Sequence, residues 1–334
     1  MREPTLLGKA ILDLLDKFPE KTSSKIADIA YRTHPDLFNS SESARTIVRY
    51  YRNAKGNEAR SFKGERREAP ESQHVKRLPD VLLLDIETAP IIVSSWTLYK
   101  PMLSHENIIE DWFIISWAAK WLYGSEIYND VVTPKESVNR DDKRICLSIF
   151  KLMEKADIII GHNAIKFDIR KINSRFLING IDKPSPYQVI DTLLHSRTNF
   201  AHSSHRLDYL GRLLVNKEKI KTDHDLWLKC KKGDQESLDY MDKYCQQDVL
   251  LLEEVYIEIR GWIKSHPNLA LYSEVDQPVC PNCLSERLEF CGEYVTPASV
   301  FDSLRCSNCG AISRMRKSKL TPTDKDRLRI SVAR

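Results

Sequence analysis

A continuous apolar run, Val81-Leu-Leu-Leu84, ends directly in two carboxylates, Asp85 and Glu87, and this feature narrows the possible folds most. An apolar run without polar alternation is typical of a strand that is buried on both faces of a sheet. Residues two apart on a strand point to the same face, so both carboxylates lie together. Their repulsion destabilises the fold unless a cation such as Mg²⁺ or Mn²⁺ compensates for it. The alternative is a strand-end turn with two solvated acids.

The segments after this run alternate between strand-like and helix-like patterns. Strands are expected at Phe113–Trp121, Ala156–Ile160 and Tyr187–Ile190. Helices are expected at Ile145–Met153 and Ile169–Leu177, and over most of residues 207–263. This alternation predicts an α/β fold in which a mixed sheet is flanked by helices.

Glycine patterns exclude several common kinds of site. The 334 residues include only 11 glycines, and they contain no G-x-G-x-x-G, no G-x-x-x-x-G-K-[ST] and no G-x-S-x-G. A dinucleotide-binding crevice, a P-loop ATPase and a nucleophile-elbow hydrolase are therefore disfavoured. No apolar run reaches the ~18 residues that span a bilayer, and residues 1–18 read as an amphipathic helix, so we expect no membrane partner.

Charge is distributed unevenly along the chain. Residues 1–78 hold 16 Lys/Arg against 11 Asp/Glu, residues 79–310 hold 27 against 34, and residues 311–334 hold 8 against 2. Basic ends attract phosphate backbones, and an acidic body that handles phosphates needs divalent cations. The alternative is that the basic ends only keep the protein soluble.

Further acids and a tyrosine occur at matching places in the predicted elements. Asp168 follows the strand expected at 156–160, after a mostly polar loop. Tyr244 and Asp248 are four residues apart in a helical segment, so they share one face. Each of these features alone is ordinary, because a Tyr/Asp pair at this spacing is usually a surface contact.

In chain order, D-I-E-T at 85–88, N-A-I-K-F-D at 163–168 and Y-C-Q-Q-D at 244–248 resemble the three exonuclease motifs of the DEDD superfamily. The resemblance covers about residues 79–263. It is greatest to the proofreading 3′–5′ exonuclease domain of family B DNA polymerases and to its free-standing relatives. The variant is the tyrosine type, because Lys243 stands where the histidine type has its histidine. The resemblance implies a ribonuclease H-like fold.

The resemblance also implies a two-metal site for phosphodiester hydrolysis from a 3′ end, releasing nucleoside 5′-monophosphates. Asp85 would bridge two Mg²⁺ (or Mn²⁺) ions, and Glu87 and Asp248 would complete the nucleophile-side ion. Asp168 would hold the second ion, and Tyr244 would orient the attacking water. DNA is the favoured substrate. The alternatives are a 3′–5′ exoribonuclease of the same fold and a catalytically inactive nucleic-acid-binding adaptor.

Three residues near these motifs have more than one interpretation. Asn163 would contact the substrate backbone, or its amide would stabilise the loop. We expect Phe167 to belong to the core rather than to form a stacking platform, and Asp191 to cap the helix that follows it rather than to act as a further acid of the site.

Two C-x-x-C pairs, Cys280/Cys283 and Cys306/Cys309, are separated by 22 residues. Four thiolates at this spacing can close a tetrahedral Zn²⁺ site, and the pattern is typical of a zinc ribbon. Such a closed site is structural and leaves no position for catalysis. The alternative is two redox-active or free pairs. We expect Cys291, between the pairs, to be a packing residue.

A basic run, Arg314, Arg316, Lys317 and Lys319, follows the second cysteine pair directly. It predicts that the ribbon presents a basic edge to nucleic acid. The alternative is that the basic run is a solvated tail, on a ribbon that only stabilises the fold or contacts another protein.

Residues 4–54 carry apolar residues at helical spacing and predict a small helical module. Arg45, Arg49 and Arg52 fall at i, i+4 and i+7 of the third expected helix and form a basic stripe. The arrangement resembles a helix-turn-helix unit that contacts nucleic acid through these arginines. The alternative is a helical protein-contact module.

These patterns divide the chain into five parts in a reducing cytoplasm, either of a bacterium or of a virus-infected cell. The parts are a helical module (1–55), a charged linker (56–78), the exonuclease domain (79–270), the zinc ribbon (275–320) and a basic tail (321–334).

Overall fold

The computed structural model describes residues 5–19, 21–51, 78–273, 275 and 277–328. The chain divides into two compact units, residues 1–75 and residues 76–334. Across the described residues, no helix is both long enough and apolar enough to cross a membrane.

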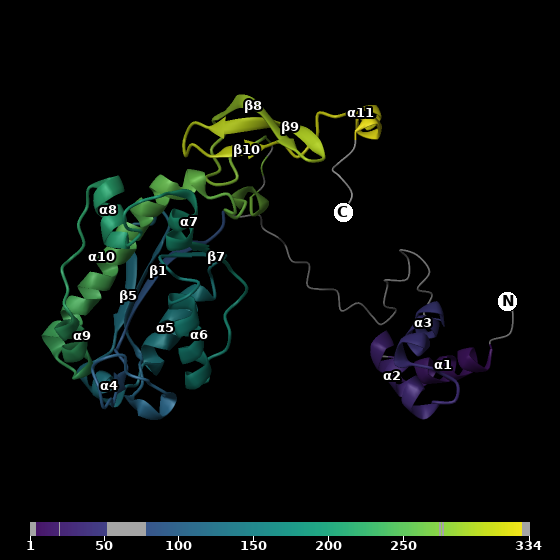
Figure 1. Ribbon diagram of the computed structural model, residues 1–334, viewed down its shortest axis with the longest axis horizontal. Coiled ribbons are helices and arrows are strands. Elements are labelled where there is room, and N and C mark those ends of the chain that lie inside the picture. The colour runs from purple at the N-terminus through teal and green to yellow at the C-terminus, as the bar shows by residue number, and fades with distance from the viewer. Residues whose placement is uncertain (1–4, 20, 52–77, 274, 276, 329–334) are drawn as a thin grey trace. The chain divides into compact units, whose positions relative to one another are not determined.

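The first unit contains three helices, α1 (Leu6–Lys17), α2 (Ser23–Thr33) and α3 (Ser41–Tyr51) (Figure 1). The side chains of Thr5 and Thr22 cap the first two helices by accepting backbone N–H groups of the first turn. The buried side chains of this unit all come from its own helices and their connections: Ile11, Leu14, Ile26, Ala27, Ala30, Phe38, Ala44 and Val48.

The second unit is built on a five-stranded mixed sheet with the strand order β5-β4-β1-β6-β7. Its strands are β1 (Val81–Thr88), β4 (Ile114–Trp121), β5 (Ile127–Val131), β6 (Ile158–Gly161) and β7 (Gln188–Asp191). β1 pairs antiparallel with β4 and parallel with β6, so it lies in the centre of the sheet. The apolar run 81–84 is buried throughout, which confirms the prediction of a central strand.

Helices cover both faces of this sheet (Figure 1). On one face Leu82 and Leu84 belong to a core that also holds residues of α5 (Lys143–Met153) and α6 (Asp168–Asn179). On the other face Leu83 packs with residues of α8 (Leu207–Val215) and α10 (Gln235–Ile259). The shorter helices of the unit are α4 (Pro134–Asn139), α7 (Thr192–Asn199) and α9 (His224–Lys231). The predicted mixed sheet flanked by helices is therefore confirmed.

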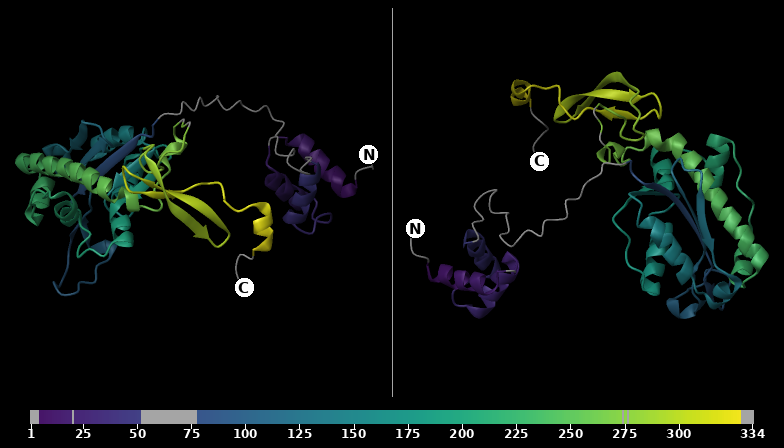
Figure 2. Two further views of the ribbon diagram at one scale, coloured as in Figure 1. Left: turned by 90° about the horizontal axis from the view of Figure 1, so that it is seen from above. Right: turned by 180° about the vertical axis from the view of Figure 1, so that it is seen from behind.

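A loop between β2 (Ile92–Val93) and β3 (Ile108–Glu110) stands away from the sheet (Figure 2). Its apolar side chains are almost fully exposed: Trp96, Leu98, Tyr99 and Met102. Large apolar side chains usually signal burial, so the sequence pattern does not predict such a loop.

The C-terminal part contains a three-stranded antiparallel sheet, β8 (Leu288–Thr296), β9 (Ser299–Cys306) and β10 (Ile312–Arg314), followed by α11 (Pro322–Arg327). It packs against the end of α10. The amide of Asn282 donates to the carbonyl of Arg260 at 2.9 Å. At Gly261 an added Cβ would lie 2.1 Å from the carbonyl oxygen of Cys309, so only glycine allows this approach.

Candidate active site and cysteine cluster

A cavity of about 1180 Å³ opens where β1 ends, and all five residues of the predicted catalytic set line it. β1 contributes Asp85 and Glu87, α10 contributes Tyr244 and Asp248, and the first turn of α6 contributes Asp168. The carboxylates of Asp85, Glu87 and Asp248 each offer an oxygen within 4.8 Å of the others. The structure thus brings together acids that are more than 160 residues apart in the sequence.

Asp168 lies in the same cavity but outside this group of three. Its Oδ1 accepts the backbone N–H of Ile86 at 3.2 Å, which fixes the carboxylate beside β1. Its charge is near enough to raise the pKa of Asp85.

Burial makes the four carboxyls unusually weak acids, and repulsion within the group adds to this for Asp85 and Glu87. Burial, followed by the charges of Asp248, Asp168 and Glu87, raises the pKa of Asp85 well above its ordinary value. Burial also raises the pKa of Glu87 and of Asp168 to about 7, and that of Asp248 to about 6. Strongly raised pKa values in one cavity are a physical signature of a functional site.

Lys219, in the connection between α8 and α9, reaches into this group. Its Nζ lies 2.5 Å from Oδ2 of Asp248 and donates to the hydroxyl of Tyr244 at 2.7 Å. Burial opposes the charge of Lys219, but Asp248, Tyr244 and Asp85 raise the pKa of its ammonium above the usual value. Sequence reasoning missed this residue, because nothing local distinguishes it from Lys217 and Lys221.

Trp227 of α9 holds the second acid of β1. Its indole Nε1 donates to Oε2 of Glu87 at 3.0 Å, and its ring meets the ring of Tyr244 edge-on at 6.1 Å between centroids. A half-buried indole N–H requires a partner, but the sequence does not say which one. Trp227 was therefore also missed.

The loop after β6 carries Asn163 and Phe167 to the cavity wall. Asn163 adopts a left-handed conformation with φ 73°, and its N–H donates to Oδ1 of Asp191 at 3.0 Å. Asp191 also accepts the N–H groups of Leu193 and Leu194, which confirms its predicted role as the cap of α7. The expectation for Phe167 was wrong: its side chain is 36% exposed and lines the cavity, because the residue lies just before α6, where the chain leaves the core.

Basic side chains also line the cavity, beside the further acids Asp208 and Glu218. Arg197, Arg206, Arg212 and Lys221 line it together with the acids. Sequence reasoning placed no basic residue here, because these four come from α7, α8 and the loops beside them and share no local pattern. A cavity that combines buried acids with exposed cations suits a phosphate-containing ligand.

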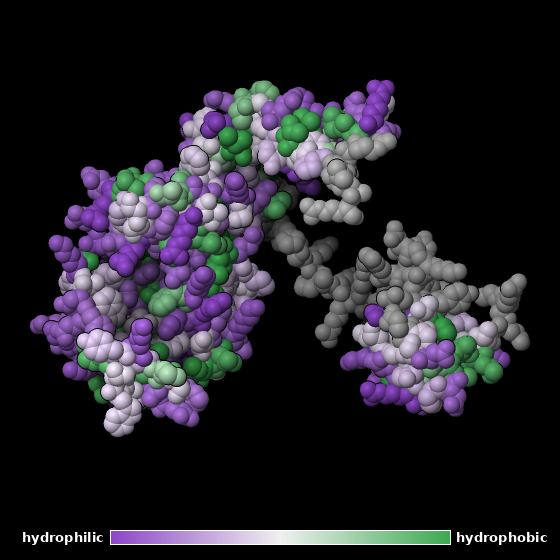
Figure 3. Space-filling model, in the orientation of Figure 1, coloured by the Kyte–Doolittle hydropathy of each residue, from purple (hydrophilic) through white to green (hydrophobic). Residues whose placement is uncertain are grey.

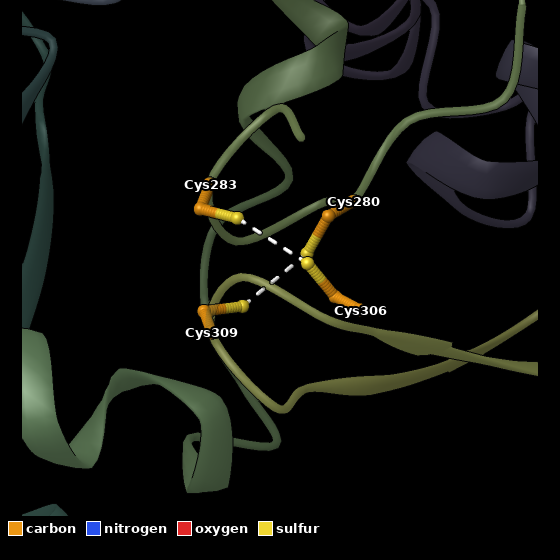
Figure 4. A group of neighbouring side chains, drawn as sticks. All are labelled: Cys280, Cys283, Cys306 and Cys309. Atoms are coloured by element: carbon orange, nitrogen blue, oxygen red, sulfur yellow. Dashed lines mark hydrogen bonds between the residues drawn. The ribbon is translucent and has the colours of Figure 1, made fainter. Parts of the chain in front are cut away.

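The four cysteines of the two C-x-x-C pairs converge, as Figure 4 shows. Their sulfur atoms all lie within 4.8 Å of one another, with 3.5 Å between Cys280 and Cys309 and 3.6 Å between Cys283 and Cys306. Four thiolates about 2.3 Å from a central Zn²⁺ in tetrahedral geometry would be separated by roughly 3.8 Å. The cluster can therefore hold a metal ion.

Cys291 is exposed, so the expectation that it packs in the fold was wrong. It lies at a β-bulge between Phe290 and Gly292, where the extra residue of β8 has no cross-strand partner.

The basic residues 314–319 do not form one uniform edge of the ribbon. Arg314, Arg316 and Lys317 are exposed, but Nζ of Lys319 pairs with Glu293 at 2.5 Å and with Asp302 at 3.2 Å. Lys319 is therefore neutralised by acids of the same sheet.

The basic stripe predicted on the third N-terminal helix is only partly described. Arg45 is half-buried in α3. The side chain of Arg49 and the whole of Arg52 lie outside the described residues.

The fold and the sites define an α/β protein with a cavity of acidic side chains and a four-cysteine cluster. No protein-family model matches the chain, and no curated protein matches it. Among solved structures, the family B DNA polymerase from the hyperthermophilic archaeon Pyrobaculum calidifontis is similar to 55% of this chain, with 14% sequence identity and a TM-score of 0.42. The similar region spans 25% of that polymerase chain. A likeness of this degree establishes neither a family nor an activity.

Proposed function

We propose that this protein is a metal-dependent 3′–5′ exonuclease that hydrolyses phosphodiester bonds of nucleic acid, preferentially DNA, and releases nucleoside 5′-monophosphates. One observation carries the proposal. Three acids from β1 and α10, remote in sequence, offer oxygens within 4.8 Å of one another in a cavity that also contains Tyr244 and Asp168. These are the residues on which the resemblance to the three exonuclease motifs depends.

The donor set fits divalent cations. It consists of oxygens, which Mg²⁺ and Mn²⁺ prefer, and its carboxyls repel one another without a compensating charge. Oδ1 of Asp248 is buried and has no hydrogen-bond partner, although Oδ2 is paired with Lys219. Asp85, Glu87 and Asp248 would hold one ion, and Asp85 with Asp168 would hold the second. When bound, such a pair of ions activates a water and stabilises the leaving oxygen.

Trp227, Tyr244 and Lys219 complete the site around these carboxylates. Trp227 fixes the orientation of Glu87 through its indole N–H. Burial, together with the charge of Asp248, raises the pKa of Tyr244 to about 12, so its hydroxyl stays protonated and can orient a water by hydrogen bonding. Lys219 places a positive charge beside Asp248 and Tyr244, where it favours an incoming phosphate.

The test is hydrolysis of 5′-labelled single-stranded DNA and RNA by the full chain with Mg²⁺. We expect products shortened one nucleotide at a time from the 3′ end, with DNA cleaved faster than RNA. Asp85→Asn should abolish cleavage. Asp239→Asn, on the exposed side of the same α10 helix, should keep the wild-type rate. Faster cleavage of RNA would favour the exoribonuclease, and binding without any cleavage would favour the inactive adaptor.

The proposal extends to the other two parts of the chain. Cys280, Cys283, Cys306 and Cys309 would hold one structural Zn²⁺, and the N-terminal helices would contact nucleic acid through the basic side of α3. Free thiols, including the buried Cys146, Cys230 and Cys245, suit the reducing cytoplasm.

A further inference from the structure

The three-stranded sheet of the ribbon has two chemically different faces. Side chains alternate along β9, and cross-strand partners share a face. Tyr294 pairs with Phe301, Ile312 with Arg305, and Arg314 with Ser303. We call this side the aromatic face, and its principal residues are Tyr294, Phe301, Arg305, Ile312 and Arg314. The opposite side, the acidic face, carries Phe290, Glu293, Val300 and Asp302.

The aromatic face exposes rings and cations together. Tyr294 is 52% exposed and Ile312 is 56% exposed. The guanidinium carbon of Arg314 lies 4.1 Å from the centroid of the Phe301 ring, so the two groups form a stacked pair at the surface. Apolar surface is visible over this ribbon among hydrophilic side chains (Figure 3).

Two cations of the aromatic face, Arg305 and Arg314, are exposed. Within the described part of the chain, neither Arg305 nor Arg314 forms an ion pair, although both are exposed. The acid on this face, Glu289, is the cross-strand partner of Arg305. Its carboxylate accepts a hydrogen bond from the hydroxyl of Ser307 at 2.7 Å.

The acidic face differs in charge although it is equally apolar. Lys319 is paired with Glu293 and Asp302, and Phe290 is 65% exposed. One side of a single small sheet therefore attracts anions, and the other side does not.

We propose that the aromatic face binds single-stranded nucleic acid, with bases stacked on Tyr294 and on the Phe301–Arg314 pair and with phosphates on Arg305. Proteins that hold single strands combine aromatic stacking surfaces with a cationic groove, because every base has a π-face and every nucleotide has a phosphate. The inference deepens the proposed exonuclease function, on which it rests for the choice of ligand. It gives the protein a second binding surface for a single strand, outside the proposed catalytic cavity.

The test measures binding without hydrolysis. Fluorescence anisotropy with a labelled thymidine oligodeoxynucleotide is recorded for the full chain without added Mg²⁺. We expect Tyr294→Ala and Arg314→Ala each to weaken binding by about tenfold, the size expected for losing one stacked base. Arg305→Gln should reduce the slope of log affinity against log salt by about one.

Matched controls come from the acidic face. Phe290→Ala removes an aromatic ring from β8, and Lys319→Ala removes a cation that pairs with acids of β8 and β9. Both variants should bind within about twofold of wild type. Equal zinc content and an equal melting temperature show that each variant is folded. The inference is overturned if the full chain does not bind the oligonucleotide, if the aromatic-face variants bind like wild type, or if the controls weaken binding as much.

The same protein separates this inference from the proposed function. Adding Mg²⁺ and following the length of the oligonucleotide measures hydrolysis independently of binding. A chain that binds through the aromatic face without cleaving would refute the exonuclease and leave this inference standing. A chain that cleaves while its aromatic-face variants bind normally would support the exonuclease and refute this inference.

Discussion

Glu87 depends on a neighbour for its orientation, since the indole of Trp227 is the group that donates to its Oε2. A carboxylate that must offer an oxygen to a cation works best when its other oxygen is held, because the side chain then loses little freedom on binding. The same logic applies to Asp168, which the N–H of Ile86 holds.

We therefore expect Trp227→Phe to lower the rate of hydrolysis by about 10–100-fold, which is typical of losing a hydrogen-bond partner of a metal ligand. The phenyl ring keeps most of the packing against Tyr244, so the melting temperature should change little. Initial rates under saturating Mg²⁺ measure the effect. Trp262→Phe, at a residue that is 62% exposed, is the control and should behave like wild type. A wild-type rate for Trp227→Phe would show that the indole N–H does not matter.

The raised pKa values predict how stability depends on pH and on metal. The pKa of Glu87 rises from 4.5 to about 7, and that of Asp168 from 3.8 to about 7, both chiefly through burial. Between these values the folded chain binds more protons than the unfolded chain, so without metal the free energy of unfolding falls as the pH rises. A bound cation compensates for the ionised carboxylates, and protons compete with it at lower pH.

Mg²⁺ should therefore raise the melting temperature more at about pH 8 than at about pH 5. Thermal denaturation with and without Mg²⁺ at both values measures the difference. Asp239→Asn should show the same difference as wild type. Equal shifts at the two pH values would contradict the assignment of these carboxyls to a metal site.

The sequence identified single site residues only where they belong to a local sequence pattern. Spacing and chain order singled out Asp85, Glu87 and Asp248, and the structure places these three side by side. Lys219 lines the cavity from a loop, and Trp227 contacts Glu87 from a helix. Both segments contain other lysines and apolar residues, so only the tertiary fold distinguishes these two.

At the scale of elements, the ribbon is a small sheet with little core of its own. Its buried apolar residues are Cys280, Cys306 and Ala311. So few buried side chains cannot hold a sheet together, and a metal bound by the cysteines would supply the missing stabilisation.

We expect one zinc ion per chain, and Cys306→Ser should abolish zinc binding and unfold β8–β10. Zinc content by elemental analysis and limited proteolysis of the ribbon are the measurements. Cys291→Ser is the matched control, because Cys291 is exposed and lies outside the cluster, and it should keep its zinc. Full zinc content in Cys306→Ser would argue against the four-cysteine site.

The elements differ in how well the sequence predicted them. β1 was predictable because a short, unbroken apolar run is typical of a strand that is buried on both faces of a sheet. The loop from 94 to 104 was not, since Trp96, Leu98 and Met102 are apolar yet exposed, against the rule by which burial is inferred.

At the scale of the whole molecule, the two units have separate cores. Within the described residues, the N-terminal core draws only on residues 7–51, and the two cores of the sheet draw only on residues from 81 onward. A unit that buries its own apolar surface can fold alone.

The fragment 79–334 should therefore fold with the melting temperature of the same unit in the full chain, and it should hydrolyse short single strands at the same rate. Calorimetry and the hydrolysis assay compare the two proteins. Loss of folding in the fragment would show that residues 1–78 contribute to the second core. The boundaries of the five predicted parts stay predictions, because residues 52–77 lie outside the described chain.

Helix α10 connects the proposed chemistry to the ribbon. It carries Asp248 near its middle and ends at Ile259. Arg260 and Gly261 follow directly, and they contact the first and the second C-x-x-C pair respectively. From 248 to 259 the helix rises by roughly 16 Å, about three turns, and its buried side chains anchor it along this length. The length of α10 therefore sets the spacing between Asp248 and the ribbon, so a strand held by both would have to span about three helical turns.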